Sequence, residues 1–274
     1  MGNALRVSFS TLGCPRWSWQ DICATARDLG YDGVEVRGVG SDLSAPSIPQ
    51  FSQDQIPATL KGLERMRLTI PCLASECCLH LRETAERTAR AVDAYIELAS
   101  ALGVPYIRVM GASAVPQPMG GVDAGFVREQ AQKFGEIAQK RGVTLLIETH
   151  GVWANSEKLA KLLDDIDSDA VQALWDIHHP YRFYGERPRV TYENLGKRIR
   201  HTHLKDSVAE GDRFRYAMPG FGDVPFEEAV GLLADQGYEG FYSLEWVKRW
   251  DLTLEEPGIV FAHTINLMRS LQER

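Results

Sequence analysis

Short apolar runs alternate along the chain with longer segments in which apolar residues recur at every third or fourth position. A short apolar run bounded by glycine or proline is typical of a buried strand, and the longer spacing is typical of an amphipathic helix. The runs predict strands at 5–11, 33–37, 70–76, 105–110, 143–149, 171–177, 199–205 and 240–246. The helical spacing predicts helices at 18–29, 54–66, 83–102, 123–141, 156–166, 191–198 and 226–237, with a closing helix near 258–272.

One unit recurs in this pattern: an amphipathic helix, a glycine, and then a run rich in β-branched residues. It occurs in "ARDLGYDGVEVRG" (26–38), "ASALGVPYIRVMG" (99–111), "AQKRGVTLLIETHG" (138–151) and "LADQGYEGFYSLEW" (233–246). The glycine supplies the left-handed residue that ends a helix, and the chain then turns into the next strand. Nearly continuous apolar strands that alternate with helices indicate a parallel sheet whose outer face is covered.

Eight such units without an intervening linker predict an α/β protein in which residues 1–274 form a single (β/α)8 TIM barrel. A doubly wound open sheet is the alternative, because it is built from the same alternation of strands and helices. Neither GxGxxG nor GxxxxGK[ST] follows any predicted strand. The sequence therefore does not indicate a cradle for a dinucleotide or a nucleoside triphosphate.

The composition narrows the class of partner. Lys and Arg number 30 and Asp and Glu number 37, which gives a net charge of −7 and disfavours nucleic acid as a partner. The sequence contains no uninterrupted apolar window long enough to predict a membrane span. The segment "MGNALRVSFSTLG" lacks the pattern of a signal peptide. The five cysteines form no CxxC pair, so we expect reduced thiols and a cytoplasmic protein.

Four consecutive predicted strands end in a side chain that can ionise, and the active site of a TIM barrel lies at these strand ends. "LLIETHG" carries Glu148, "LWDIHHP" carries Asp176, "HTHLKDS" carries His203 and "YSLEWVK" carries Glu245. Each interrupts an apolar run, where burial of an unpaired charge is costly. A single ionisable residue at a strand end is explained by an ion pair. Four such residues that converge on the same end of the barrel predict a shared divalent metal ion.

Three carboxylates and one imidazole form a harder ligand set than that of structural zinc sites, which favour thiolates and histidines. Oxygen-rich ligation suits Mn²⁺, Mg²⁺ or Co²⁺, and Zn²⁺ is also compatible with these ligands. We therefore expect one divalent metal ion as the cofactor. Its open positions would accept water or two neighbouring substrate oxygens.

The motifs "IETHG", "WDIHHP", "HTHLKDS" and "PGFGDVPF" resemble those of the xylose isomerase-like TIM barrels, the sugar phosphate isomerases and epimerases. The resemblance extends from "VSFSTLG" to the last helix and includes inosose dehydratases. It implies the metal ligands Glu148, Asp176, His203 and Glu245, with Glu148 and Glu245 also as the catalytic acid/base pair. It further implies that His179, three residues after Asp176, contacts the substrate, with His178 as its neighbour.

This resemblance implies a cytoplasmic isomerase or epimerase of carbohydrate metabolism that acts on a sugar, a sugar phosphate or a polyol ketone. The reaction removes a proton beside a carbonyl, and a metal stabilises the resulting enediolate while one glutamate takes the proton and the other returns it. A dehydratase of an inosose-like substrate is one alternative, because the enediolate can expel a β-hydroxyl. A non-catalytic metal- or sugar-binding barrel is another. Relatives are commonly dimers, so a homodimer is a further expectation.

Several polar residues near the predicted strand ends are candidate substrate contacts. Strand alternation puts Lys205 on the same side as His203, where it can contact a substrate oxygen or phosphate or instead pair with Asp206. His150 is in phase with Glu148 and is a second candidate.

Glu35 and His80 lie at or just after the ends of the second and third predicted strands, and ion pairs with Arg37 and Arg82 are their alternatives. Trp246 can line the pocket, as can Trp17, or it can belong to the core. Arg213 and Arg215 lie in a predicted glycine-rich loop that either closes over a substrate or is solvated.

The sequence departs from the motifs of two related branches, and these differences limit the classes of substrate. Ketose 3-epimerases resemble one another in a glutamate and an arginine that here correspond to Ala154 and Ala209. The "HLKD" form resembles the inosose branch more closely, which argues against a free ketohexose. The endonuclease IV branch has an Asp-x-His at a position where 216–218 read "YAM", so a nuclease is not predicted.

Overall fold

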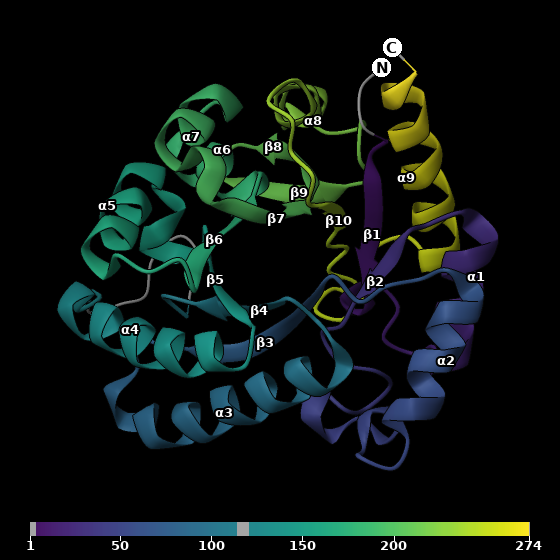
Figure 1. The fold of residues 1–274 in the computed structure, drawn as a ribbon. Helices are drawn as coiled ribbons and strands as arrows, with labels where there is room; N and C mark the ends of the chain where they lie inside the picture. The colour runs from purple at the N-terminus through teal and green to yellow at the C-terminus, as the bar shows by residue number, and fades with distance from the viewer. Residues whose placement is uncertain (1–3, 114–120, 274) are drawn as a thin grey trace. The chain divides into compact units, whose positions relative to one another are not determined.

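The structure is a computed structural model that describes residues 4–113 and 121–273 (Figure 1). The chain divides into two compact units. One consists of residues 1–71 together with 202–274, and the other of residues 72–201. Among the helices of the described ranges, none has the length and apolar composition that a membrane span requires.

The first unit is built on four parallel strands in the order β2-β1-β10-β7. These strands are β1 (Arg6–Ser10), β2 (Gly33–Glu35), β10 (Phe241–Leu244) and the part of β7 (Ile199–Leu204) from Thr202 onward. The helices are α1 (Trp19–Leu29), α2 (Ile56–Met66), α8 (Phe226–Asp235) and α9 (Pro257–Gln272). Short 3-10 turns lie at Thr11–Gly13, Ala45–Ser47 and Pro49–Phe51.

The first and last elements of this unit pack on one another. Phe9 of β1 stacks on Phe261 of α9 with ring centroids 4.0 Å apart, and the Tyr31 hydroxyl donates to the Phe261 carbonyl at 2.8 Å. The Leu5 N–H donates to the Gln272 side chain at 3.1 Å. Aromatic packing and these hydrogen bonds therefore hold α9 against β1, which pairs with both β2 and β10.

The second unit contains four parallel strands in the order β6-β5-β4-β3. They are β3 (Cys72–Cys78), β4 (Tyr106–Met110), β5 (Thr144–Glu148) and β6 (Val171–Asp176). The helices are α3 (Ala85–Leu102), α4 (Ala124–Lys140), α5 (Ser156–Ile166), α6 (His178–Tyr184) and α7 (Pro188–Leu195), with 3-10 turns at Arg82–Thr84, Gly151–Ala154 and Gly196–Arg198. In Figure 1, α3 lies alongside α4, and α4 also contacts β5 and β6.

The strands are buried as their continuous apolar runs predict. All six residues of β6 are buried, as are the last four of β5 and of β1. The repeated helix–glycine–strand unit is also present, since α1 ends at Gly30 and α3 at Gly103, both with left-handed φ angles of 82° and 67°. All eight predicted strands exist; β2 and β10 are shorter than predicted, and β3 begins later than predicted, at Cys72.

Three features differ from the prediction. The strand ending at Asp176 leads into helix α6 and not into a turn, because the side chain of Asp176 accepts the N–H groups at the start of that helix. The helix predicted at 191–198 begins earlier, at Pro188, and ends before Gly196, since proline favours the first helical position. The segment predicted as a glycine-rich loop forms an antiparallel hairpin of β8 (Asp206–Glu210) and β9 (Arg213–Ala217).

Asp206 anchors the chain that follows this hairpin. Its carboxylate accepts hydrogen bonds from the backbone N–H groups of Ser207, Gly220, Gly222 and Val224 at 2.8–3.2 Å. A Cβ atom at Gly222 would lie 1.9 Å from the Asp206 Oδ1 atom, so only glycine allows this approach. One buried carboxylate thus replaces the regular backbone pairing that this irregular segment lacks.

Replacement of Asp206 by alanine is expected to loosen the segment from Ser207 to Val224. The substitution leaves four N–H groups without their acceptor, at a cost of about 1–3 kcal/mol for each group that stays buried. Hydrogen exchange followed by mass spectrometry should show faster exchange in this segment. Glu210→Ala, at an exposed ion pair with Arg215, is the control and should exchange like the unmodified protein.

Two helical glycines are expected to respond in opposite ways to replacement by alanine. A Cβ atom on Gly135 of α4 would meet Val171 Cγ2 at 2.6 Å, whereas a Cβ atom on Gly62 of α2 would meet nothing within 4 Å. Gly62→Ala should raise the free energy of unfolding by about 1 kcal/mol, since alanine favours the helix. Gly135→Ala should lower it, because overpacking costs about 1–3 kcal/mol. Equal shifts in chemical denaturation would contradict the close packing of α4 on β6.

Candidate metal centre

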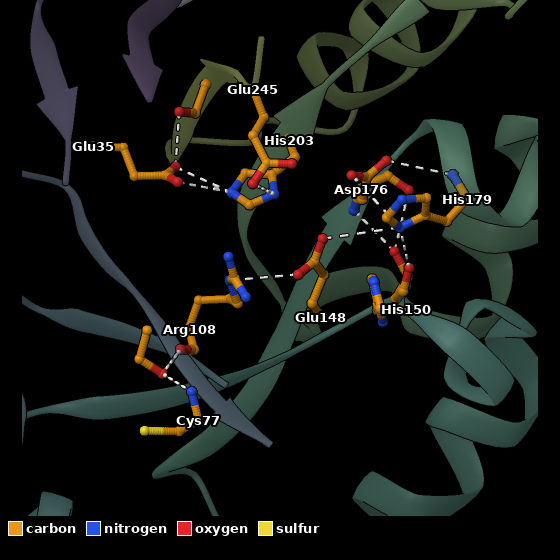
Figure 2. A network of polar contacts seen from close by, with 12 residues as sticks. Glu35, Cys77, Arg108, Glu148, His150, Asp176, His179, His203 and Glu245 are labelled. Carbon is orange, nitrogen blue, oxygen red and sulfur yellow. Dashed lines mark hydrogen bonds and ion pairs between the residues drawn. The ribbon is translucent and has the colours of Figure 1, made fainter. Parts of the chain in front are cut away.

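His203, near the end of β7, is held by a carboxylate from β2. Its Nε2 atom lies 3.0 and 3.2 Å from the two carboxylate oxygens of Glu35, and the Ser243 hydroxyl of β10 donates to Glu35 Oε2 at 2.8 Å (Figure 2). All three side chains are fully buried. The sequence offered Glu35 as a substrate contact or as the partner of Arg37, and the structure brings it to His203.

The opposite edge of the His203 ring faces Glu245, which follows β10. Its Nδ1 atom lies 3.5 Å from Glu245 Oε1, and Lys205 forms an ion pair with Glu245 Oε2. Lys205 and Glu245 are both buried, and a buried ion pair is stable only when its geometry offsets the loss of hydration. Lys205 therefore lies against a predicted metal ligand, while Asp206 binds backbone N–H groups.

In the second unit, Asp176 ends β6 and is fully buried. Its Oδ1 atom accepts the backbone N–H groups of His178 at 2.9 Å and His179 at 3.4 Å, the first two residues of α6. The Thr149 hydroxyl accepts the Asp176 N–H at 2.9 Å and donates to the Asp176 carbonyl at 3.1 Å. A carboxylate at a helix N-terminus is favoured by the exposed N–H groups there, and this fixes the direction of the side chain.

His179 lies beside both predicted carboxylate ligands of this unit. Its Nδ1 atom is 3.0 Å from the Thr149 carbonyl, 3.6 Å from Asp176 Oδ2 and 3.9 Å from Glu148 Oε1 (Figure 2). A carbonyl only accepts, so the contact assigns the proton to Nδ1. The His150 ring meets the His179 ring edge-to-face at 5.1 Å, and His150 Nδ1 lies 2.9 Å from the Ala112 carbonyl.

Glu148 at the end of β5 is paired with Arg108, which was not among the predicted site residues. Arg108 Nε of β4 lies 3.4 Å from Glu148 Oε2, and both side chains are buried. The signal was present in "YIRVMG", where an arginine interrupts an apolar strand. A charge at such a position needs a partner.

The described residues include groups that can hold a metal ion. Within the second unit, ligand atoms of Glu148 and Asp176 lie within 4.8 Å of one another, as do those of Asp176, His178 and His179. Within the first unit the same limit holds for His203 and Glu245. Each unit thus brings together two of the four ligands that the sequence predicts, and carboxylate with imidazole is a donor set for a divalent transition metal or Mg²⁺.

Two further residues predicted as substrate contacts, His80 and Trp246, form hydrogen bonds with neighbouring groups. His80 Nδ1 lies 3.0 Å from Cys78 Sγ, and His80 Nε2 lies 3.3 Å from the Ser113 hydroxyl. Burial raises the pKa of Cys78 to about 11 and lowers the pKa of His80, so this contact is a thiol–imidazole hydrogen bond and not an ion pair. Trp246 is buried and its indole N–H donates to the Glu255 carbonyl at 3.0 Å, which matches the core alternative.

Three other candidate residues, Trp17, Arg213 and Arg215, do not belong to the groups of described residues that can hold a metal ion. The Trp17 ring packs edge-to-face on Phe261. Arg213 and Arg215 are exposed on β9, and Arg215 pairs with Glu210, as expected for solvated charges.

Comparison with known proteins gives a family and several relatives. Residues 23–271 match the model of the family described as xylose isomerase-like TIM barrel. Fructoselysine 3-epimerase of Shigella flexneri is 23% identical over 276 residues, which cover 97% of this chain and 98% of the relative. Inosose dehydratase 2 of Bacillus cereus is 29% identical over 158 residues, 51% of each protein.

The fold is also found among solved structures. A xylose isomerase-like TIM barrel protein from Mycobacterium smegmatis, in complex with magnesium, superposes with a TM-score of 0.76 at 16% identity. The superposition covers 97% of this chain and 96% of that chain. The predicted (β/α)8 fold class is therefore confirmed, and the protein belongs to the xylose isomerase-like TIM barrel family.

Proposed function

We propose that this protein is a divalent-metal-dependent isomerase or epimerase that acts on a sugar, a sugar phosphate or a polyol ketone through an enediolate. The observation that carries the proposal is the burial of carboxylates and histidines at the C-terminal ends of parallel strands, where TIM barrels hold their active sites. Membership of the family and the similarity to an epimerase and a dehydratase support the reaction class.

We assign one divalent metal ion to Glu148, Asp176, His203 and Glu245. His203 supports this assignment, because its Nε2–H bond to Glu35 leaves Nδ1 as an acceptor that faces the Glu245 carboxylate at 3.5 Å. Two acceptors this close are stabilised by a cation between them, and a metal ion bound there would supply it. Oxygen-rich ligation fits Mn²⁺, Mg²⁺ or Co²⁺ and is compatible with Zn²⁺, and a structural neighbour was solved with magnesium.

The bound metal and the two glutamates have different roles in the proposed reaction. When bound, the metal supplies the positive charge that polarises the substrate carbonyl and stabilises negative charge on its oxygens. Glu148 and Glu245 act as the acid/base pair: one takes the proton from the carbon beside the carbonyl and the other returns a proton. The ion pairs with Arg108 and Lys205 restrict how these two carboxylates can turn.

Substrate hydroxyls are assigned to His179, Lys205 and His150. The Nδ1–H group of His179 is directed at the Thr149 carbonyl, so the tautomer keeps Nε2 as an acceptor for a hydroxyl. Lys205 supplies a positive charge beside Glu245. The contacts of Glu35, His80 and Trp246 favour supporting roles for these three residues. The homodimer and the cytoplasmic location stay predictions.

A dehydratase of an inosose-like substrate is the second candidate, supported by the similarity to inosose dehydratase 2 over about half of each chain. Both reactions begin with removal of the same kind of proton. They differ in the next step, since a dehydratase expels a β-hydroxyl as water and an epimerase returns the proton to carbon. A non-catalytic metal- or sugar-binding barrel would remove no proton at all.

Metal analysis tests the ligand set. After loading with Mn²⁺ and dialysis, the protein should hold one ion per chain by elemental analysis, and Asp176→Ala or His203→Ala should weaken binding by more than about 100-fold. His178→Ala is the control, because the proposed set excludes His178. Loss of metal in His178→Ala with retention in His203→Ala would instead indicate the group of Asp176, His178 and His179.

Exchange in deuterated water tests the reaction. Mn²⁺-loaded protein should introduce deuterium beside the carbonyl of a ketose, a sugar phosphate or an inosose from a substrate panel. Glu148→Gln and Glu245→Gln should each lower the exchange rate by about 10²–10⁴-fold. Glu256→Gln, at an exposed carboxylate, is the control. A product that is one water lighter than its substrate identifies the dehydratase, and an absence of exchange across the panel with bound metal contradicts an enzyme of this class.

A further inference from the structure

We infer that Glu35 is a positioning residue that fixes the tautomer and orientation of His203, so that Nδ1 and not Nε2 is presented as the ligand atom. The inference rests on the proposed metal ligation by His203. It gives Glu35 a role that differs from the substrate contact expected from its place at the end of a strand.

Glu35 has the geometry of a hydrogen-bond acceptor for the imidazole. Both of its carboxylate oxygens lie within 3.2 Å of His203 Nε2, and Ser243 donates to one of them at 2.8 Å. All three side chains have zero exposed surface. A buried carboxylate needs donors, and an imidazole N–H with a serine hydroxyl supplies two of them.

The bond to Glu35 decides which nitrogen carries the proton. In neutral imidazole one nitrogen donates and the other accepts, so a proton held on Nε2 by Glu35 leaves the lone pair on Nδ1. Nδ1 lies on the ring edge that faces Glu245. In the other tautomer a hydrogen atom would occupy the direction from which a metal must bind. Carboxylate partners of this kind commonly orient histidine ligands.

The sheet register makes Glu35 suitable for this role. Ser10 pairs with Glu35 between β1 and β2, and Ser243 pairs directly with His203 between β10 and β7. Glu35 meets the ring edge of His203 opposite to Glu245. A residue with no exposed surface in this position acts on the site through His203 and Ser243.

Two measurements test the inference: the tautomer of His203 and the affinity for Mn²⁺. The histidines are labelled with ¹⁵N, and the signals of His203 are identified by their loss in His203→Ala. The metal-free protein should show a proton on Nε2 of His203, and Glu35→Gln should give a mixture of tautomers because an amide both donates and accepts. Glu35→Ala should weaken Mn²⁺ binding by about 10–100-fold in calorimetry.

Glu186→Gln is the matched control, because Glu186 also accepts serine and threonine hydroxyls but belongs to the α5–α7 contact. It should change neither measurement. Glu35→Gln is nearly isosteric with the original residue. If Glu35→Ala does not fold, the tautomer and the Mn²⁺ affinity of Glu35→Gln test the inference. An unchanged tautomer and an unchanged Mn²⁺ affinity in Glu35→Gln would overturn the inference.

The same variants separate this inference from the proposed function. If His203→Ala weakens Mn²⁺ binding and the Glu35 variants do not, Glu35 has no positioning role and the ligand set stands. If His203→Ala leaves Mn²⁺ binding unchanged, the proposed ligand set fails, whatever the tautomer shows.

Discussion

The burial of charge at the ends of parallel strands is the constraint on which the rest of the site depends. Asp176 and Glu35 have no exposed surface, so water cannot solvate them and the protein must supply donors. Asp176 receives the N–H groups that begin α6, while Glu35 receives Ser243 and His203. These donors stabilise the two carboxylates and at the same time hold each side chain in one direction.

Strand register then determines which charges meet. Arg108 pairs with Leu146 between β4 and β5, so Glu148, two residues further along, lies on the same face of the sheet. His203 pairs with Ser243 between β7 and β10, so Lys205 and Glu245 each lie two residues beyond a matched pair. Both proposed acid/base glutamates therefore form an ion pair with a cation, Arg108 in β4 and Lys205 directly after β7.

Much of this molecule could be predicted from local pattern. Apolar runs located all eight strands, and glycines such as Gly30 ended helices where the repeated unit requires a left-handed residue. The same runs identified the strand-end residues Glu148 and Asp176, because a charge inside an apolar run is conspicuous. The β8–β9 hairpin was missed, since its polar composition resembles that of a loop. The organisation of 1–274 as a single domain stays a prediction.

The sequence by itself determined the order of strands and helices and the residue types at the strand ends, because both follow from periodicity over short distances. Only the tertiary structure determined which of these side chains contact one another. Glu35 and His203 are 168 positions apart, and no local spacing encodes their contact. Strand alternation does not apply to His178 and His179, because α6 begins at His178 and a helix rotates side chains by a different period. Long-range hydrogen bonds and the start of that helix set the geometry of the site.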